Sequence, residues 1–543
     1  MIKICIRYVF KSALFWAYLG LSLLLSLSSL AAPFLIGQII NLLTSGNSSV
    51  ADALPLCLLL ASLGIGSAVL SYMSEMMYIK TQSHAGFKLN ADTISHVQRL
   101  PQAFFIHFDA SFYNQQINHD SNDLIIFLIS SCVQLVSNGC LLFAAMFILC
   151  ALDIRMGLVC LGLSGLACAM YLLFRRVLFS TNLDAQNQTA TFFSCLQDQL
   201  DRIAFIQQHA LYGRFRQVLS RTFDDVYQTL LLRQRSESSF SLSNAIVSAL
   251  CQGGIFLVGA YEIISGRLLA GYLITALSYY STFNSSLQFF AAFGKDYQTA
   301  RVCLERLQRI WEIPEEKNGE VILRDIHIIE CRNLAYLYPG NNGPSFQRVN
   351  ALFEQGKLYG IAGRNGAGKT TLLKVLSGLY PHDIQGCIRY DGVSLQNIDC
   401  TKMREHCFGM TEQEPPILQD TFFANATLLA ENPDLKLLDS YIDLLGLREM
   451  IESSSAGIQT MLDGHQPNLS GGERQKLAII RQLMKDPTVM LFDEPTSAMD
   501  AASKKKFIRL LEVKRLGHIL IVVTHDSDLL EVCDEVIDLE PKR

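Results

Sequence analysis

Charged residues are scarce in this sequence. Lysine, arginine, aspartate and glutamate make up 17% of the 543 residues, whereas hydrophobic residues make up 50%. A soluble domain typically has about 25% charged residues. The scarcity is uneven, because charged residues are sparse before Ala300 and ordinary after it. Since the chain is too long for one ordinary domain, the sequence predicts a membrane half followed by a soluble half.

A basic excess and a cysteine framework are both missing. The formal net charge is −5, which is unlike the strongly basic character of a nucleic-acid binder. The 15 cysteines include no Cys-x-x-Cys pair and no cysteine–histidine cluster of zinc-like spacing. We therefore interpret them as small, reduced hydrophobic residues, and we expect no nucleic-acid partner.

Apolar runs dominate the first half, and each is long enough to cross a bilayer, which takes about 20 residues in a helix. They lie at about residues 12–42, 52–79, 122–152, 156–178, 241–265 and 269–295. The first run is too long for the core of a secretory signal and is followed by others like it. The sequence therefore predicts a polytopic α-helical membrane domain with six transmembrane helices.

Positive charge is concentrated on one side of the expected membrane. The N-terminus and the segments 80–121 and 179–240 hold most of the loop lysines and arginines, whereas the other loops offer only Arg155 and Arg267. Because positively charged loops stay inside the cell, the N-terminus and both long segments are expected to be cytoplasmic. Their helical periodicity indicates that the spanning helices continue into the cytoplasm.

A linker and a second domain follow the last run. Residues 296–313 are expected to form a helix that ends before Pro314, and the polar stretch 314–319 is the expected linker. We therefore place the membrane domain at 1–313 and a soluble domain at 320–543. In the soluble domain, expected strands alternate with helical patterns, which is typical of an α/β fold with a mainly parallel sheet. These strands are Ile326–Cys331, Leu358–Ile361, Val489–Phe492 and Ile519–Val523.

The strongest motif is a glycine-rich loop between an expected strand and an expected helix. Residues 363–371 read Gly-Arg-Asn-Gly-Ala-Gly-Lys-Thr-Thr, which matches the P-loop pattern G-x-x-x-x-G-K-T. Backbone N–H groups of such a loop surround phosphate oxygens at the positive end of the helix dipole. We expect Lys369 to reach the β- and γ-phosphates and the Thr370 hydroxyl to bind Mg²⁺. The expected nucleotide-binding residues of the loop are Gly363, Asn365, Gly366, Gly368, Lys369, Thr370 and Thr371.

Two carboxylates follow an otherwise apolar strand. Val489–Phe492 is succeeded directly by Asp493 and Glu494. Buried charge without a partner is costly, so a strand that ends in two carboxylates needs a reason. Downstream of a P-loop, Asp493 fits as a partner of Mg²⁺ and Glu494 as the group that polarises the attacking water. The sequence therefore predicts nucleotide hydrolysis in an α/β P-loop NTPase domain.

A third motif narrows the class of NTPase. Residues 469–475 read Leu-Ser-Gly-Gly-Glu-Arg-Gln and resemble the LSGGQ signature of the ATP-binding-cassette (ABC) family, with Glu473 in place of glutamine. The resemblance implies that two such domains hold two ATP molecules between them, each P-loop facing the partner's signature. Ser470, Gly471 and Gly472 are then expected to bind the partner's nucleotide at a helix N-terminus.

Other family motifs have matches one residue at a time. Tyr338 resembles the aromatic residue that stacks on adenine, and Tyr336 is the neighbouring candidate. Gln413 resembles the glutamine that contacts Mg²⁺ and water, and His525 resembles the histidine that touches the γ-phosphate. The stretch 497–500, Ser-Ala-Met-Asp, resembles the family's SALD loop. The resemblance thus implies a catalytic set of Glu494, His525 and Gln413 with ATP and Mg²⁺.

The arrangement of six spans before one cassette resembles a half-transporter of the ABC exporter type. It implies ATP-driven export of a peptide or small amphipathic compound by a dimer, expected to be of identical chains, in the lipid of the bacterial inner (plasma) membrane with the cassette in the cytoplasm. Lipid or drug export and a heterodimer remain open, as does an ATP-dependent membrane regulator or sensor. Because few residues precede the first span, we expect no N-terminal peptidase domain.

Cargo-contacting and coupling segments are the least specific predictions. The resemblance places cassette-docking helices at Ser111–Asn118 and about Phe205–Phe215. Polar residues inside the spans are candidate cargo contacts, although those near span ends can reach the interface and amides can bond a neighbouring helix. The candidates are Glu75, Gln134, Asn138, Glu262, Asn284 and Gln288. Among them we favour Asn284 and Gln288, with Ser285 between them, as lining a cavity.

Overall fold

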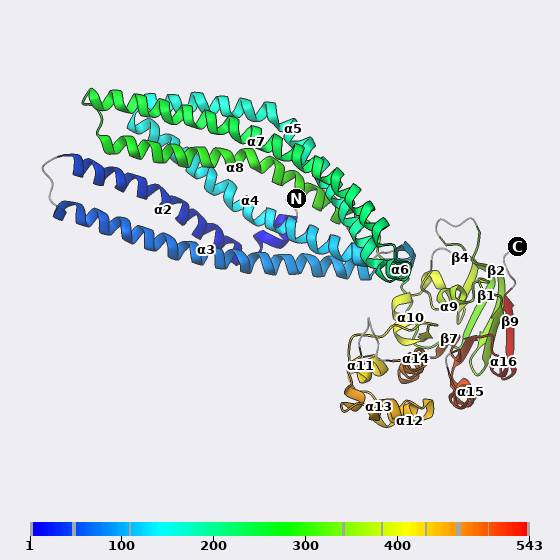
Figure 1. Cartoon of the computed structure of the whole chain (residues 1–543). Coiled ribbons are helices and arrows are strands. Elements are labelled where there is room, and N and C mark those ends of the chain that lie inside the picture. Colours follow the sequence, from blue (N-terminus) through cyan, green and yellow to red (C-terminus); the bar gives the residue numbers. More distant parts are fainter. Residues whose placement is uncertain are drawn as a thin grey trace. The chain divides into compact units, whose positions relative to one another are not determined.

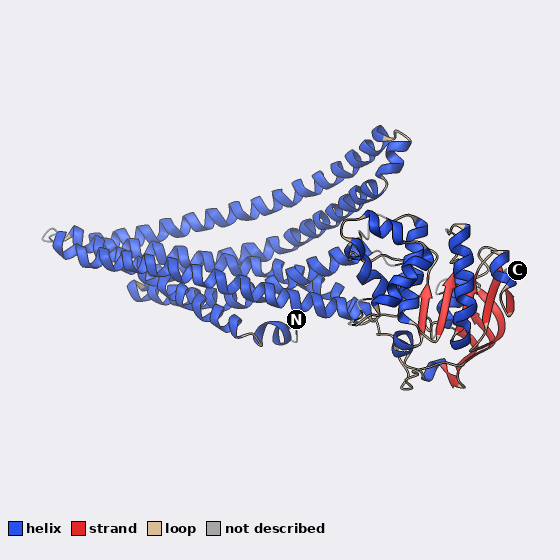
Figure 2. Cartoon of the chain, turned by 90° about the horizontal axis from the view of Figure 1, so that it is seen from below, coloured by secondary structure: helices blue, strands red, loops and turns tan. Residues whose placement is uncertain are grey.

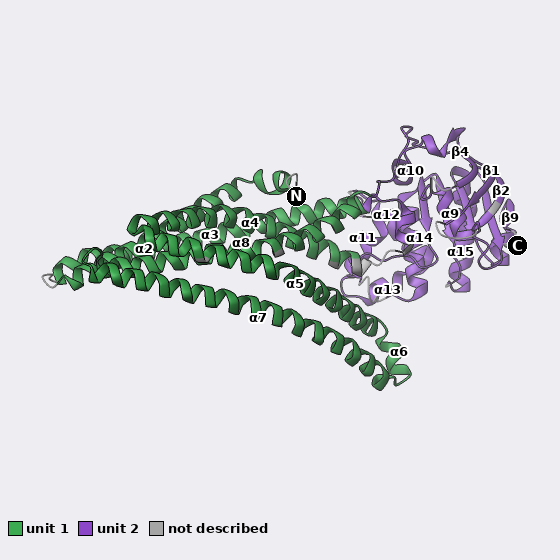
Figure 3. Ribbon diagram, turned by 90° about the horizontal axis from the view of Figure 1, so that it is seen from above, with its two compact units in different colours: residues 1–97, 110–312 green, residues 98–109, 313–543 purple. Residues whose placement is uncertain are grey.

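The chain forms two compact units, which Figure 3 colours separately. The computed structural model describes residues 4–45, 50–107, 110–338, 343–381, 384–428, 430, 432–462, 469–497 and 499–539. Unit 1 comprises Met1–Val97 and Ala110–Glu312, and unit 2 comprises Gln98–Asp109 and Ile313–Arg543. Unit 1 is built of long helices, whereas the strands that the structure describes lie in unit 2 (Figure 2).

Long helices make up unit 1 (Figure 1). After a short π-helix at Cys5–Phe10 come α2 (Ala13–Thr44), α3 (Val50–Gln98), α4 (Ala110–Leu152), α5 (Ile154–Asp201), α6 (Ile203–Gln208), α7 (Tyr212–Ile264) and α8 (Ala270–Trp311). With 49, 48 and 53 residues, α3, α5 and α7 continue well beyond their apolar runs, because a span of about 20 residues suffices for a bilayer. Residues 111–118 are the first turns of α4, and 205–215 include most of α6 and the start of α7.

Five helices within the described residues are long and apolar enough to cross a membrane, namely α2, α3, α4, α5 and α7. The sixth expected run lies in α8, which is 42 residues long but is not among these five. Serine, threonine, asparagine and glutamine interrupt its apolar residues, which lowers its hydropathy. The helical membrane domain is therefore confirmed, whereas the count of six crossings is not.

The helices of unit 1 pack mainly in pairs. α5 lies along α7, and α4 lies along α8, while α2 contacts both α8 and α4. Short α6 joins the ends of α5 and α7 (Figure 3). One apolar core gathers α4, α5, α7 and α8, and a second gathers the π-helix with parts of α2, α3, α4 and α8. α8 thus belongs to both cores and is the helix around which unit 1 is organised.

Glycines at the crossing of α2 and α8 allow the two helix backbones to come into direct contact. Asn41 Oδ1 accepts a hydrogen bond of 2.7 Å from Gly271 N, and a Cβ added to Gly271 would lie 2.0 Å from Gly37 O. Further along, the Tyr279 hydroxyl donates to Leu30 O at 2.6 Å. Between apolar helices, small residues permit such close packing and polar side chains then bond across it. The crossing therefore tolerates no side chain at Gly271.

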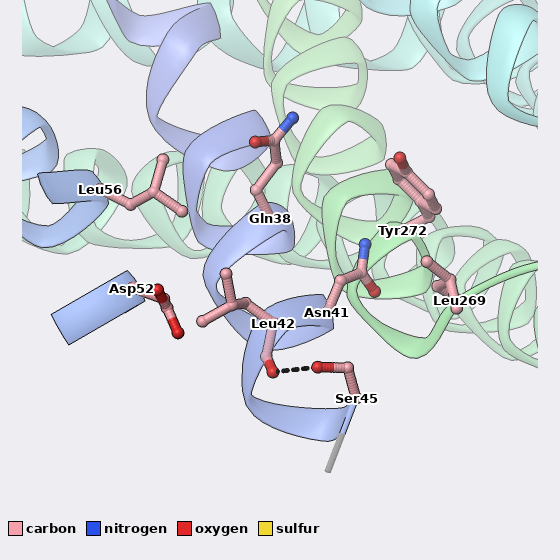
Figure 4. Close-up of a pocket in the computed structure, with 8 residues that line it drawn as sticks. All are labelled: Gln38, Asn41, Leu42, Ser45, Asp52, Leu56, Leu269 and Tyr272. Atoms are coloured by element: carbon pink, nitrogen blue, oxygen red, sulfur yellow. Dashed lines mark hydrogen bonds between the residues drawn. The ribbon is translucent and has the colours of Figure 1, made fainter. Parts of the chain in front are cut away.

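Two polar features lie at the ends of these helices. A cavity of about 390 Å³ next to the crossing is shown in Figure 4 and is lined by Gln38, Asn41, Leu42, Ser45, Asp52, Leu56, Leu269 and Tyr272. Separately, the Glu262 side chain is 3% exposed and is bonded by Arg155, with Arg267 Nη1 3.6 Å from its other oxygen. Glu262 thus forms ion pairs within unit 1 with Arg155 and Arg267, the two arginines that the sequence places in the short loops.

Two sheets form the frame of unit 2. The antiparallel sheet has the order β2-β1-β4-β5, and the parallel sheet has the order β6-β7-β8-β3-β9. Their strands are β1 (Ile328–Tyr336), β2 (Phe346–Glu354), β3 (Leu358–Gly363), β4 (Ile384–Tyr390), β5 (Val393–Ser394), β6 (Phe408–Thr411), β7 (Val489–Asp493), β8 (Ile519–Val523) and β9 (Glu535–Leu539). β7 and β8 are buried along their whole length, as expected for central parallel strands covered on both faces.

Helices surround the parallel sheet. They are α9 (Lys369–Leu376), α10 (Cys400–His406), α11 (Phe422–Thr427), α12 (Leu435–Leu445), α13 (Arg448–Ser453), α14 (Gly471–Lys485), α15 (Ala501–Lys514) and α16 (Ser527–Glu531). Because β8 pairs in parallel with both β7 and β3, the carboxyl ends of all three strands lie at one edge of the sheet. In open parallel sheets this edge is where ligands bind.

The glycine crossing generates a stability prediction. Gly271→Ala places a Cβ against the Gly37 carbonyl, and overpacking of this kind costs about 1–3 kcal/mol. We expect a lower apparent melting temperature for the purified, detergent-solubilised chain. Gly66→Ala on α3 is the matched control, because nothing lies within 4 Å of the added Cβ. Equal melting temperatures for the two variants would contradict the crossing.

Candidate nucleotide-binding site

The glycine-rich loop leaves β3 and enters α9 through backbone conformations that favour glycine. Gly363, Gly366 and Gly368 have φ values of 145°, 80° and 91°, a region that costs other residues steric strain. Gly368 has a second constraint, since a Cβ there would lie 2.5 Å from Ser345 O. The loop is therefore held tightly against the start of β2, with its N–H groups at the N-terminus of α9.

A cavity of about 540 Å³ opens beside this loop, within the range of about 300–1,000 Å³ that is usual for ligand pockets. Its lining residues are Tyr338, Ser345, Asn365, Gly366, Gly368, Lys369, Thr370, Thr371, Gln413, Asp493 and Glu494. All except Ser345 were expected from the sequence. The sequence does not predict Ser345, because a single serine before a strand belongs to no motif. The fold thus brings together the P-loop, the β7 carboxylates, Gln413 and Tyr338.

Thr370 and Asp493 meet directly across the floor of the cavity. The Thr370 hydroxyl donates to Asp493 Oδ2 at 2.7 Å, and Asp493 is 2% exposed. Burial raises the pKa of Asp493, while the Thr370 hydrogen bond and the charges of Lys369 and Lys374 oppose this shift. A hydroxyl and a carboxylate side by side offer the hard oxygen ligands that Mg²⁺ prefers.

Lys369 joins the loop to His525. Its side chain is buried, and Nζ lies 2.6 Å from both Gly363 O and His525 Nε2. His525 Nε2 in turn lies 3.6 Å from Glu494 Oε1. His525 is not among the residues that line the cavity, yet these contacts place it beside two that do. The ends of β3, β7 and β8 are therefore connected through one chain of polar side chains.

Glu494 has a strained backbone. Its φ is 51°, a left-handed conformation that costs a residue with a Cβ about 1–2 kcal/mol. Three hydrogen bonds hold this backbone: Glu494 N donates to Val523 O at 2.9 Å, and Glu494 O accepts from Gln475 Nε2 at 2.6 Å and from Ser497 N at 3.2 Å. Gln475 is 1% exposed on α14. No motif predicts a role for it, although an amide on the buried face of an amphipathic helix is a signal of one. Strain of this kind is concentrated at functional sites.

The structure separates the two tyrosine candidates. Tyr336 is fully buried in the core of the antiparallel sheet, whereas Tyr338 lines the cavity and its hydroxyl lies 3.1 Å from Thr371 Oγ1. The rings of the two tyrosines pack edge to face at 4.9 Å between centroids. Tyr336 thus packs against Tyr338, and of the two tyrosines Tyr338 is the one that lines the cavity.

The signature residues lie apart from this cavity. Ser470, Gly471 and Gly472 do not line it; they begin α14. Ser470 N donates to Glu473 Oε2 at 2.7 Å and Glu473 N donates to Ser470 Oγ at 3.3 Å, a reciprocal capping box. The capping box explains why glutamate is accommodated where the family motif has glutamine.

The loop at residues 497–500, which comes after β7, is described only in part, because Ala498 lies outside the described residues. Asp500 of this loop caps α15 by accepting a hydrogen bond from Ser503 N at 2.8 Å.

Comparison with known families identifies both units. Residues 15–287 match the ABC transporter transmembrane region, and residues 346–497 match the ABC transporter family. The chain therefore belongs to the ABC transporter family, with an ATPase domain coupled to a transport domain on one polypeptide.

Individual relatives are exporters of different kinds. The transport/processing ATP-binding protein ComA of Streptococcus pneumoniae is 24% identical over 477 residues, which cover 87% of this chain but only 66% of ComA. The multidrug resistance-like ATP-binding protein MdlB of Buchnera aphidicola is 25% identical over 95% of this chain and 89% of its own length. The ATP-dependent lipid A-core flippase of Salmonella typhimurium is 22% identical over 98% of this chain and 91% of its own length.

A solved structure shares the whole fold. A bacterial Atm1-family ABC exporter with ATP bound superposes with a TM-score of 0.83, covering 97% of this chain and 94% of that chain at 17% identity. At this identity the likeness establishes the fold alone. Both units of this chain therefore have their counterparts in one exporter.

Burial of Asp493 yields a pH-dependent prediction. Its folded pKa lies above the unfolded value, so the carboxyl costs no stability at low pH, and the cost develops as the pH rises through the folded pKa. Asp493→Asn keeps an acceptor for Thr370 without the charge. We expect the nucleotide-free variant to melt about 2–4 °C higher than wild type at neutral pH, with the gain shrinking as the solution is acidified.

Melting curves across acidic to neutral pH measure this gain. Asp538→Asn, at an exposed position of β9, is the control for the exchange of aspartate for asparagine away from the cavity and should melt like wild type at neutral pH. A lower melting temperature for Asp493→Asn at neutral pH would show that the carboxylate stabilises the empty site.

Proposed function

We propose that this chain hydrolyses ATP to export a peptide or small amphipathic compound, as one half of a dimer. The observation that carries the proposal is the cavity in which the P-loop, the Thr370–Asp493 pair and Glu494 converge, in a chain whose other unit matches an ABC transmembrane region. We assign residues 1–313 to the transmembrane domain, 314–319 to the linker and 320–543 to the cassette.

In the proposed site, Tyr338 stacks on adenine and the P-loop amides hold the phosphates. Thr370, Asp493 and Gln413 would hold Mg²⁺ through their side-chain oxygens, and the ion would neutralise phosphate charge. The lining of the cavity fits this use, because Gln413, Thr370 and Asp493 all face it. Lys369 contributes the positive charge for the β- and γ-phosphates.

Hydrolysis is assigned to Glu494 and His525. Glu494 orients and polarises the attacking water, and its strained backbone fixes the carboxylate at the end of β7. His525, 3.6 Å from Glu494 Oε1, is positioned to contact the γ-phosphate. These are positioning and electrostatic tasks, which account for most of the catalysis of phosphoryl transfer.

We propose a dimer because the signature residues of this chain do not line its own nucleotide cavity. Ser470, Gly471 and Gly472 lie outside the cavity, and we assign them to the nucleotide of a second, identical chain. The extensions of α5 and α7 also expose large apolar side chains beyond the spans, which suits burial against a partner. They include Phe193, Leu200, Phe223 and Tyr227.

α8 is the proposed sixth crossing and lines the cargo path. Its Tyr279, Tyr280 and Phe283 are buried against the bundle, whereas Ser281, Ser285 and Gln288 are exposed. Residues spaced in this way share one helix face, and a polar face within a span is expected to meet water or protein rather than lipid. Asn284, by contrast, donates to Ser248 Oγ at 3.4 Å and is assigned to helix packing. We place the chain in a bacterial inner membrane, with its N-terminus and its cassette on the cytoplasmic side.

The proposed cycle uses two linked states. ATP closes the two cassettes, the cytoplasmic helix ends carry this motion into the membrane domain, and the central path opens outward; hydrolysis then resets the cassettes. A membrane regulator that hydrolyses ATP without moving cargo is the alternative from another class. Transport across a proteoliposome membrane separates the two.

The test of the ATPase assignment is Glu494→Gln. The variant keeps the size and polarity of the side chain but loses the carboxylate, so we expect ATP binding to persist while turnover falls about 100-fold or more. Phosphate release and binding of a fluorescent ATP analogue measure the two properties. Glu512→Gln on the exposed face of α15 is the matched control. Wild-type turnover in Glu494→Gln would overturn the assignment.

The cargo path is tested by replacing Ser281, Ser285 and Gln288 together with leucine. We expect ATP-driven uptake of fluorescent peptides and amphipathic dyes into inside-out proteoliposomes to fall about tenfold, while basal ATPase activity remains. Ser62→Leu, at an exposed serine of α3, is the single-site control. Unchanged uptake would remove the polar face of α8 from the path, and ATPase stimulation without any uptake in wild type would favour the regulator.

A further inference from the structure

The linker, residues 314–319, is held to the rest of unit 2 by hydrogen bonds. Gly319 N donates to Ile398 O at 2.9 Å, and Asn318 Nδ2 donates to Thr401 Oγ1 at 3.0 Å. Most importantly, Glu316 forms two parallel hydrogen bonds with Arg404, of 2.7 and 3.0 Å. Both side chains are largely shielded, with 15% and 23% of their surface exposed. Paired bonds of this kind fix geometry as well as attraction.

Arg404 also contacts the P-loop helix. Its Nη1 donates to Gly378 O at 2.6 Å, and Gly378 follows the C-terminus of α9, where φ is 72°. A cation at a helix C-terminus is favourably placed relative to the helix dipole. The N-terminus of the same helix carries Lys369 and Thr370. A short, rigid helix therefore separates Arg404 from the nucleotide cavity.

The signature helix ends at the same place. Lys485, in the last turn of α14, donates to Arg404 O and to Phe408 O, both at 2.7 Å. The other end of α14 is capped by Ser470. Phe408 begins β6, and Gln482 of α14 donates to Gly409 O in that strand at 3.0 Å. β6 leads directly to Gln413 of the cavity. Arg404 thus contacts Gly378 after α9 and Lys485 in the last turn of α14, and Lys485 extends the connection to β6. The opposite ends of these three elements carry the P-loop residues, the signature residues and Gln413.

The exits of two membrane helices reach Glu316. α8 ends at Trp311, a few residues before Glu316, and α3 ends at Gln98, directly before Arg99. Glu316 N donates to Arg99 O at 2.8 Å. Within unit 1 the same two helix ends are already joined, since Trp311 Nε1 donates to Thr93 Oγ1 at 3.2 Å. The segments that follow α3 and α8 are therefore held together at Glu316.

We propose that the Glu316–Arg404 pair is the joint through which the nucleotide state of the cassette reaches α3 and α8. This inference rests on the proposed ATP-driven function. Glu316 and Arg404 are positioning residues: neither lines the cavity, and they act by making the linker follow α9, α14 and β6. Mostly buried ion pairs contribute little net stability, whereas they can specify one arrangement. Loss of the joint therefore uncouples the helix ends without emptying the ATP site.

Hydrogen exchange of the full-length protein in lipid nanodiscs tests this joint. Exchange is compared with and without MgATP and vanadate, both in the P-loop and at the helix ends 90–99 and 304–312. In Glu316→Gln we expect nucleotide protection of the P-loop to persist, while the nucleotide-dependent change at both helix ends falls about threefold or more. Arg404→Lys is the second variant, because lysine cannot reproduce the two parallel bonds, and it should show the same separation.

Glu315→Gln is the matched control. Glu315 is the adjacent acid, its contact with Arg99 is 3.9 Å long, and 44% of its side chain is exposed; its exchange pattern should match wild type. An undiminished response at the helix ends in both joint variants would overturn the proposal. Loss of P-loop protection in both would assign the pair a purely structural role and also overturn it. A wild-type protein that shows no response to nucleotide anywhere would instead contradict the proposed ATP-driven function.

Discussion

The order of three parallel strands determines the rest of unit 2. β8 lies between β7 and β3, so the P-loop that follows β3 and the carboxylates that end β7 are delivered to one edge of the sheet. The Thr370–Asp493 hydrogen bond of 2.7 Å is possible only because of this order. β7 and β8 are buried throughout, and the apolar packing of both faces keeps the edge rigid. The polar groups of the site are therefore held by an apolar frame.

The site itself carries costs that this frame offsets. Asp493 is buried with a raised pKa, and Glu494 is held at a positive φ. The positive φ of Glu494 costs about 1–2 kcal/mol, and burial disfavours the charged form of Asp493. The apolar surface that a domain buries offsets such costs. Both carboxylates line the same cavity. Gln475 connects this strain to the helix that begins at Ser470, so the two halves of the proposed ATP site belong to one packed structure.

The helices of unit 1 are held together differently. Within a membrane the hydrophobic effect does not drive helices together, so close packing and hydrogen bonds between helices must do so. Glycine at 271 allows α2 and α8 to touch through their backbones, and tyrosine and asparagine side chains bond across the crossing. α8 contributes to both apolar cores while it keeps a polar face free of them. The same polar residues lower its hydropathy, so apolar length alone does not mark α8 as a membrane crossing.

The sequence by itself determined the class of the protein and most of the nucleotide site. Local chemistry sufficed for this, because a P-loop, a strand-end carboxylate pair and a signature are contiguous motifs whose roles follow from their residue types. Apolar length likewise sufficed for a helical membrane domain. Only the tertiary structure showed that Tyr338 lines the cavity while Tyr336 is buried, that Glu262 forms an ion pair, that Ser345 also lines the cavity and that Gln475 bonds the backbone of Glu494. Those outcomes depend on burial and on contacts between distant segments. The contact of Arg404 with Glu316 and Gly378 is of the same kind, since no local pattern joins a linker, the end of α9 and a residue of α10 that lie far apart in the chain.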